Sequence, residues 1–169
     1  YHDVSYDGTT GHIDFEDLNW EKKTYNPWAA YAQSKLANVL FAREYAGRVK
    51  GVTCVSCHPG WVHTSLMRHE MPTGLVTCLL PVFKAQGMIS LEDGLEVPLY
   101  CVLSDDLENG AYYEQGNTHM TKLPGGMPAQ PRAGGEGTDP AVAAKLWKAT
   151  ESLIEKAGAA GSKWSVNSV

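Results

Sequence analysis

Apolar and polar residues recur along the chain with two different periods, and each period predicts a different kind of element. From about Trp28 to Lys50 strong helix formers dominate. Leu36, Val39 and Leu40 recur there at helical spacing, so this segment predicts a helix with one apolar stripe. Residues 52–58 are β-branched or small and apolar, which predicts a strand buried on both faces, as in a parallel sheet. A helix followed by such a strand predicts half of a βαβ unit.

The rest of the chain predicts two further helices and one further strand. Residues 61–89 show an irregular pattern, whereas Ser90 resembles the start of a capping box for a helix that ends near Leu103. The segment 110–113 predicts a short final strand. Thr138 or Asp139 is expected to cap a last helix, with the following proline at its first position.

Length and composition predict one folded domain over residues 1–169. The chain is 43% hydrophobic, which suffices for one core. Residues 117–139 are rich in glycine and proline and predict a surface loop, and residues 158–169 predict a flexible tail.

The charge of the chain argues against nucleic-acid binding, and its hydropathy argues against a membrane-spanning helix. The net charge is −5, so nothing predicts nucleic-acid binding. The longest apolar stretch, Gly74–Phe83, is broken by Pro81 and is shorter than the ~20 residues of a membrane span. This apolar stretch could instead form an apolar lid or a peripheral membrane contact. The chain starts at Tyr1 without a secretory signal or a methionine, which indicates either processing or a fragment of a longer chain.

Cysteine and histidine placement favours no metal or haem site. Four cysteines make no disulfide framework at this size and fit either an intracellular, reducing compartment, which we favour, or simple burial as small apolar residues. Cys54, Cys57 and His58 match the haem-attachment pattern only formally, because strand residues three apart point to opposite faces. The scattered histidines lack paired ligand spacing, so no metal is expected.

One pair of residues in the first predicted helix can carry chemistry. Tyr31 and Lys35 are four apart and therefore lie on the same helical face. A cation beside a phenol favours the ionised phenol, which makes Tyr31 a plausible proton donor or acceptor. Hydride transfer to or from a carbonyl needs such a group. Alone, however, the pair is more often a simple surface contact.

The sequence around this pair changes that interpretation. Tyr-Ala-Gln-Ser-Lys-Leu-Ala-Asn at 31–38 is followed, after the predicted strand, by His-Pro-Gly-Trp-Val-His-Thr at 58–64. Together these resemble the short-chain dehydrogenase/reductase family, in its retinol dehydrogenase and WW-domain oxidoreductase branch. Further matches to the same branch are the segments 14–19, 92–94, 139–140 and 146–147, so the resemblance covers about residues 11–157.

The resemblance implies a fold, a cofactor and a set of roles. The fold is α/β, a Rossmann-like doubly wound parallel sheet of which the chain holds the C-terminal portion. Tyr31 is the implied general acid/base, and Lys35 favours its ionised form and holds the nicotinamide ribose. The implied cofactor is NAD or NADP, and a Met- and Leu-rich loop at about 66–89 suits an apolar substrate. The implied contacts of the nicotinamide end are Pro59, Gly60, Val62 and Thr64.

The chain also departs from the family. The glycine-rich phosphate loop and the Asn-Ala-Gly segment of the family are absent. The catalytic serine is either Ser5 or a residue upstream of Tyr1. Half a parallel sheet would expose an apolar edge. We therefore expect the chain to work with the missing N-terminal half, as a homo-oligomer, or as a subunit of a larger assembly.

Two functions remain open on the sequence. The first is an NAD(P)-dependent oxidoreductase that acts on an apolar alcohol or carbonyl, retinol-like or steroid-like. The second is a non-catalytic structural or assembly subunit derived from the same family. The sequence determines neither the substrate nor the choice between NAD and NADP.

Overall fold

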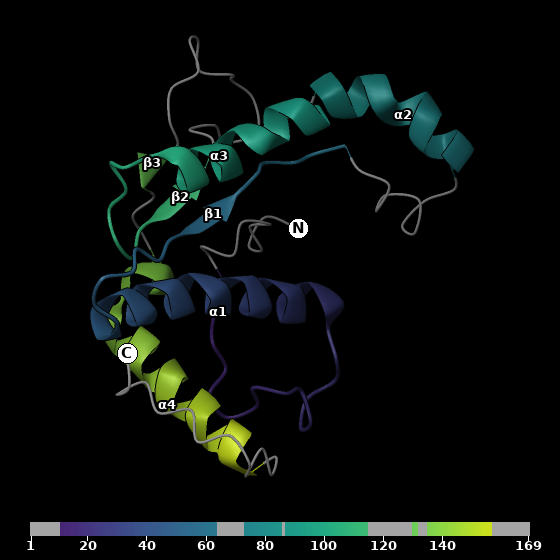
Figure 1. Ribbon diagram of the computed structural model, residues 1–169. Coiled ribbons are helices and arrows are strands. Elements are labelled where there is room, and N and C mark those ends of the chain that lie inside the picture. Colours follow the sequence, from purple (N-terminus) through teal and green to yellow (C-terminus); the bar gives the residue numbers. More distant parts are fainter. Residues whose placement is uncertain (1–10, 64–72, 86, 115–129, 132–134, 157–169) are drawn as a thin grey trace. The chain divides into compact units, whose positions relative to one another are not determined.

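The computed structural model describes residues 11–63, 73–85, 87–114, 130–131 and 135–156. These residues form helices and a small sheet, which is compatible with part of the predicted α/β fold (Figure 1). In chain order the elements are α1 (Pro27–Arg48), β1 (Ser56–His58), α2 (Thr73–Ala85), α3 (Leu91–Leu103), β2 (Tyr112–Glu114), β3 (Gln130–Pro131), the 3-10 turn η2 (Glu136–Thr138) and α4 (Pro140–Lys156).

By their internal contacts the residues divide into two compact units, where the sequence predicted one domain. Unit 1 takes its residues from the ranges 1–56, 107–111 and 133–169. Unit 2 takes its residues from 57–106 and 112–132. Each unit is described by itself.

Unit 1 is built on the packing of α1 against α4 and η2. The apolar stripe of α1 supplies Leu36 and Leu40, both fully buried, and α4 supplies Ala143 and Leu146. Ile13, from the segment before α1, completes this cluster. The stripe that the sequence predicted for α1 is therefore the face that makes the core.

Side-chain caps explain where three of the helices begin. Asn26 Oδ1 accepts hydrogen bonds from the backbone N–H groups at positions 28 and 29, which fixes the start of α1. Ser90 Oγ accepts from Asp93 N at 3.0 Å at the start of α3. Asp139 Oδ1 accepts from Ala141 N at 2.8 Å at the start of α4. The predicted cap at Ser90 is confirmed, and of the two predicted alternatives Thr138 and Asp139 the structure shows Asp139 as the cap of α4. The Asn26 cap was not predicted.

The sheet has the strand order β1-β2-β3. Gly110 N donates to Cys54 O and Ser56 N donates to Ala111 O, so the segments that lead into β1 and β2 run in the same direction. The pair β2–β3 is antiparallel, however, with Tyr113 opposite Pro131. A wholly parallel sheet was expected, and β3 comes from the range that the sequence assigned to a surface loop.

Two expectations about elements were wrong. The strand at 52–58 was expected to be buried on both faces, but β1 spans three residues and the Cys57 side chain is exposed. The reason is its place at one end of the strand order. Residues 61–89 were expected to be irregular, but α2 is a helix with Pro81 inside it. A single internal proline removes one backbone hydrogen bond, and the leucines around it still favour the helix.

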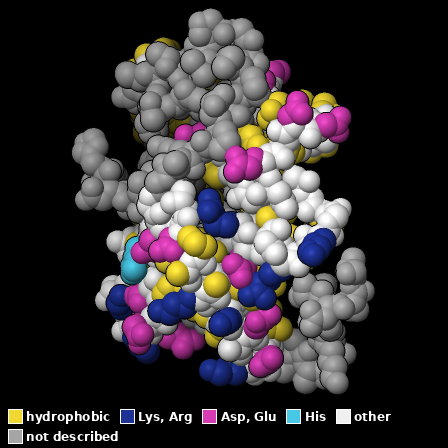
Figure 2. All heavy atoms as spheres, turned by 90° about the vertical axis from the view of Figure 1, so that its left-hand side faces the viewer, with side chains coloured by type: hydrophobic (Ala, Val, Ile, Leu, Met, Phe, Trp, Pro, Cys, Tyr) yellow, Lys and Arg dark blue, Asp and Glu magenta, His cyan; other side chains and the backbone are white. Residues whose placement is uncertain are grey.

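Within the predicted loop 117–139, the described residues form β3 and η2, and Gly137 is buried against Leu36 and Val39 of α1. The predicted tail at 158–169 lies outside the described residues. On the face shown in Figure 2, side chains of both charge signs lie next to one another between apolar patches. None of the helices in the described ranges has the length and apolar character needed to cross a bilayer.

Candidate active site

Helix α1 brings Tyr31 and Lys35 together. The Lys35 ammonium lies over the phenol ring, with Nζ 5.2 Å from the ring centroid. Both side chains are on the exposed side of the helix, and 41% of Tyr31 is accessible. The shared helical face that the sequence predicted for this pair is therefore present in unit 1, while the chemical roles of the two residues stay predictions.

The same turn of α1 is fixed to the preceding loop through Gln33. Its side chain is 9% exposed and makes two hydrogen bonds with the loop backbone. Gln33 Oε1 accepts from Asp14 N, and Gln33 Nε2 donates to Leu18 O, both at 3.0 Å. A residue between the two candidate catalytic side chains thus anchors the helix, which orients the face that Tyr31 occupies.

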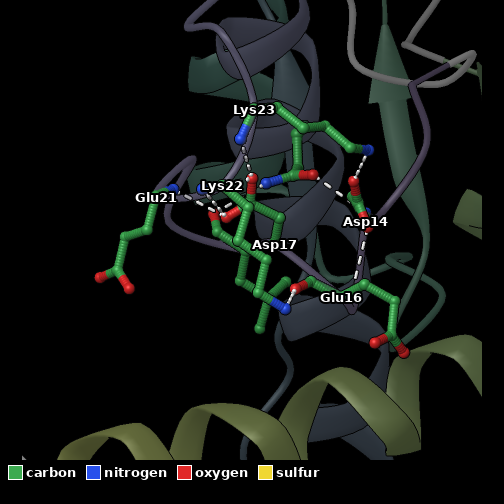
Figure 3. Close-up of polar contacts among 8 residues, drawn as sticks. Asp14, Glu16, Asp17, Glu21, Lys22 and Lys23 are labelled. Atoms are coloured by element: carbon green, nitrogen blue, oxygen red, sulfur yellow. Dashed lines mark hydrogen bonds and ion pairs between the residues drawn. The ribbon is translucent and has the colours of Figure 1, made fainter.

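The loop itself is organised by the Asp17 carboxylate (Figure 3). Asp17 is 6% exposed, and its oxygens accept hydrogen bonds from the backbone N–H groups of Glu21, Lys22 and Lys23. Burial alone would raise the pKa of Asp17, but these three N–H groups outweigh burial and hold the pKa below its ordinary value of 3.8. The carboxylate therefore acts as the fixed centre of a turn that leads into α1.

A neighbouring ion pair strengthens the same loop. The Lys23 ammonium donates to the Asp14 carboxylate (Figure 3). This hydrogen bond is the main cause that lowers the pKa of Asp14 and raises the pKa of Lys23. Since Asp14 N also donates to Gln33, the pair links the loop to the helix that carries Tyr31.

In unit 2 the candidate cofactor-binding residues form a turn after β1. Gly60 has a φ of +88°, a conformation that glycine adopts without strain, and Gly60 N donates to His58 Nδ1 at 3.0 Å. Val62 then forms an isolated parallel bridge with Ile89. Pro59, Gly60 and Val62 thus lie in one turn that the bridge holds. Thr64 lies outside the described residues, as does Ser5.

The turn is also tied to α2. The Trp61 ring packs on Phe83 of α2, with 5.7 Å between the ring centroids. Helix α2 exposes about half of the Leu75 and Val82 side chains. The part of the predicted substrate loop that the structure describes is therefore an apolar helix attached to the candidate nicotinamide turn.

The four cysteines are not arranged as the haem-attachment pattern would suggest. All four are free thiols. The Cys57 side chain lies close enough to Cys101 of α3 to affect its ionisation. Burial, assisted by Cys57, raises the pKa of Cys101 to about 11. Over the residues described, no group of three or more His, Cys, Asp or Glu side chains is placed to hold a metal ion.

Three residues that help to hold the backbone near the candidate site residues were not predicted, namely Asp17, Gln33 and Gly94. Gln33 had a detectable signal, because it stands one helical turn before Leu36 on the buried face, where a polar residue needs partners. Gly94 had one too, because a glycine inside a helical pattern often marks close packing. The four backbone hydrogen bonds to Asp17 depend on the path of the loop, which no local pattern predicts.

Comparison with known proteins finds relatives over most of the chain. Retinol dehydrogenase 13 from Mus musculus is 36% identical over 161 residues, which is 90% of this chain and 44% of the relative. Dehydrogenase/reductase SDR family member 13 from Homo sapiens is 35% identical over 156 residues, which is 85% of this chain and 36% of the relative. The chain thus spans less than half the length of these two relatives.

A solved structure shares the fold of most of the chain. The crystal structure of an uncharacterized protein from Mycobacterium paratuberculosis superposes with a TM-score of 0.61 at 29% sequence identity, over 90% of this chain and 48% of that one. No protein-family model matches the chain. On the strength of its relatives, the chain is a partial-length homologue of the short-chain dehydrogenase/reductases.

Proposed function

We propose that this chain carries the proton-transfer part of an NAD(P)-dependent oxidoreductase that acts on an apolar alcohol or carbonyl. The observation that supports it is the Lys35 ammonium placed over the accessible Tyr31 ring on one face of α1. Relatives named as retinol dehydrogenases support the same reaction class and favour a retinol-like substrate over a steroid-like one.

In this proposal Tyr31 moves the proton. As the carbonyl carbon is reduced, the oxygen gains a proton from the Tyr31 hydroxyl, and in the reverse direction the phenolate takes it back. Lys35 is near enough to stabilise the negative charge that forms on the phenol. Gln33 keeps the helix in register with its loop, so the phenol keeps its direction.

The residues also suit a nicotinamide nucleotide, which supplies or accepts the hydride when it is bound. Lys35 is an exposed donor on the same face as Tyr31, as ribose hydroxyls require. The turn at Pro59, Gly60 and Val62 is held in place by the bridge to Ile89 and would flank the nicotinamide end, with Thr64 near the phosphates. The rest of a doubly wound parallel sheet would carry the phosphate loop, so NAD or NADP binding is a property of the complete protein.

The apolar character of the substrate rests on α2. Leu75 and Val82 are exposed on a helix whose only charged residue is Lys84. Trp61 connects this helix to the turn after β1. A surface of this kind binds a hydrocarbon chain or ring system better than a polar substrate.

The decisive experiment replaces Tyr31→Phe in the complete protein and measures turnover of a retinoid alcohol with each nucleotide. We expect kcat/KM to fall by about 10²–10⁴-fold, because the proton donor is lost while the ring remains. The control is Tyr45→Phe, on the same helix but packed against Phe41, and it should keep wild-type turnover.

Near-normal turnover by Tyr31→Phe would end the proposal. Failure of the wild-type protein to bind either nucleotide would favour the alternative, a non-catalytic subunit derived from the same family. Nucleotide binding by fluorescence titration therefore accompanies the kinetic measurement.

A further inference from the structure

Gly94 lies where α3 meets the turn after β1, and no side chain has room there. A Cβ built on Gly94 would be 2.5 Å from Val62 Cγ2 and 3.1 Å from Val62 Cγ1. Both values are below normal carbon–carbon contact, which begins near ~3.5 Å. The backbone of α3 and the Val62 side chain are therefore in direct contact.

Backbone conformation does not explain a glycine at this position. Gly94 is a helical residue and is not among the residues with positive φ. A glycine inside a helix costs about 1 kcal/mol relative to alanine. The close approach of Val62 is the feature that requires it.

The backbone on both sides of the contact is fixed. Ile89 N donates to Trp61 O at 2.9 Å, and His63 N donates to Ile89 O at 3.0 Å. Ser90, the next residue, caps α3 through Asp93 N. The Val62 backbone is therefore fixed, so a new side chain at position 94 requires the Val62 methyl groups to turn away from α3 or this bridge to break.

We infer that Gly94 is a positioning residue for the nicotinamide end of the cofactor site, because the missing Cβ allows Val62 to sit against α3. This inference rests on the proposed function, which puts Val62 in the turn that flanks the nicotinamide end of the nucleotide. A side chain at position 94 pushes Val62 toward the nucleotide and disturbs nucleotide binding, while Tyr31 and Lys35 on α1 are unchanged.

The test uses four variants of the complete protein: Gly94→Ala, Val62→Ala, the double variant, and Gly47→Ala as control. Gly47 lies near the end of α1 with no atom within 4 Å of a built Cβ. Dissociation constants for NADH and NADPH are measured by fluorescence titration, KM and kcat by turnover, and stability by thermal unfolding.

We expect Gly94→Ala to weaken nucleotide binding about tenfold and to raise the nucleotide KM more than it lowers kcat. Gly47→Ala should bind as the wild type does. The double variant should bind as Val62→Ala does, because removing the two Cγ atoms removes the clash. If Gly94→Ala does not fold, a double variant that folds and binds nucleotide with the affinity of Val62→Ala supports the inference. A double variant that also fails to fold overturns it.

Two outcomes separate this inference from the proposed function. Wild-type binding of nucleotide together with unchanged affinity in Gly94→Ala would overturn this inference alone, as would a defect that Val62→Ala does not relieve. A wild-type protein that binds neither nucleotide would overturn both.

Discussion

At the scale of single residues, buried polar groups fix the loop before α1. Asp17 is nearly inaccessible and is compensated by backbone donors, and Gln33 uses its carbonyl and its amide for two different backbone partners. Each group would be costly to bury without these bonds. The loop is therefore held in one conformation by a few specific contacts.

The lowered pKa of Asp17 makes part of the stability depend on pH. A carboxylate whose folded pKa is below its unfolded value stabilises the fold above the unfolded pKa and loses that effect as pH falls through the folded pKa. Asp17→Asn should therefore lower the unfolding midpoint at about pH 7, and the difference from wild type should shrink below about pH 4.

Urea unfolding of the wild type and of Asp17→Asn across this pH range checks the expectation. The series at about pH 7 is the reference, because the carboxylate is ionised in both folded and unfolded states there and its contribution is fully present. A stability difference that stays constant from neutral to acid pH would show that the Asp17 charge makes no such contribution.

The thiol of Cys101 provides a second prediction at this scale. With a pKa of about 11, it is almost wholly protonated at about pH 8, and thiolate is the form that reacts. Iodoacetamide should label Cys101 at least about tenfold more slowly than the exposed Cys78. Peptide mass spectrometry after timed quenching measures both rates.

The label rate at Cys101 should keep rising as pH is increased toward 11. Cys57→Ser should accelerate it, because Cys57 contributes to the raised pKa after burial does. Equal labelling of Cys101 and Cys78 at mildly alkaline pH would contradict the assignment.

At the scale of elements, α1 divides its two faces between structure and chemistry. Leu36 and Leu40 are buried against α4, while Tyr31 and Lys35 are exposed. This division could be predicted from the sequence, because it follows from helical periodicity alone. The link to the loop through Gln33 could not, since it depends on which backbone groups the loop brings near.

The packing of α1 on α4 predicts a large cost for one substitution. Leu36 is fully inaccessible and contacts the cluster that includes Ile13 and Ala143. Leu36→Ala should lower the free energy of unfolding by about 2–5 kcal/mol, through lost burial and the cavity that remains. Denaturant titration of the complete protein, monitored by circular dichroism, measures it.

Leu153→Ala is the matched control, because Leu153 lies on α4 but is 37% exposed. Its cost should be about 1 kcal/mol or less. Equal effects of the two substitutions would mean that the α1–α4 contact is not the core of unit 1.

Two elements show why local pattern was insufficient. Residues 52–58 were interpreted as a strand buried on both faces, yet β1 is short and none of its residues is fully buried, because burial depends on neighbours and not on composition. Residues 61–89 were interpreted as irregular, yet α2 lies within this range and includes Gly74 and Pro81. A glycine or a proline inside a helix costs a limited free energy, which the other residues of the segment can outweigh.

At the scale of the whole molecule, the candidate residues are distributed over both units. Tyr31 and Lys35 belong to unit 1, and Pro59, Gly60 and Val62 belong to unit 2.

Helix α3 of unit 2 also exposes a row of apolar side chains, namely Leu91, Leu95, Leu99, Val102 and Leu103. The relatives are more than twice the length of the segments that align with this chain.

The sequence by itself determined the helix with its Tyr-x-x-x-Lys face, the cap at Ser90, and the family relationship. These depend on residues close together in the chain, where spacing and side-chain chemistry are sufficient. Only the tertiary structure decided the antiparallel strand β3, the helix α2, the Gln33 and Asp17 anchors and the contact between Gly94 and Val62. Those features join residues far apart in the chain or depend on the loop path, because their energies come from packing and hydrogen bonds that form only when the chain is folded.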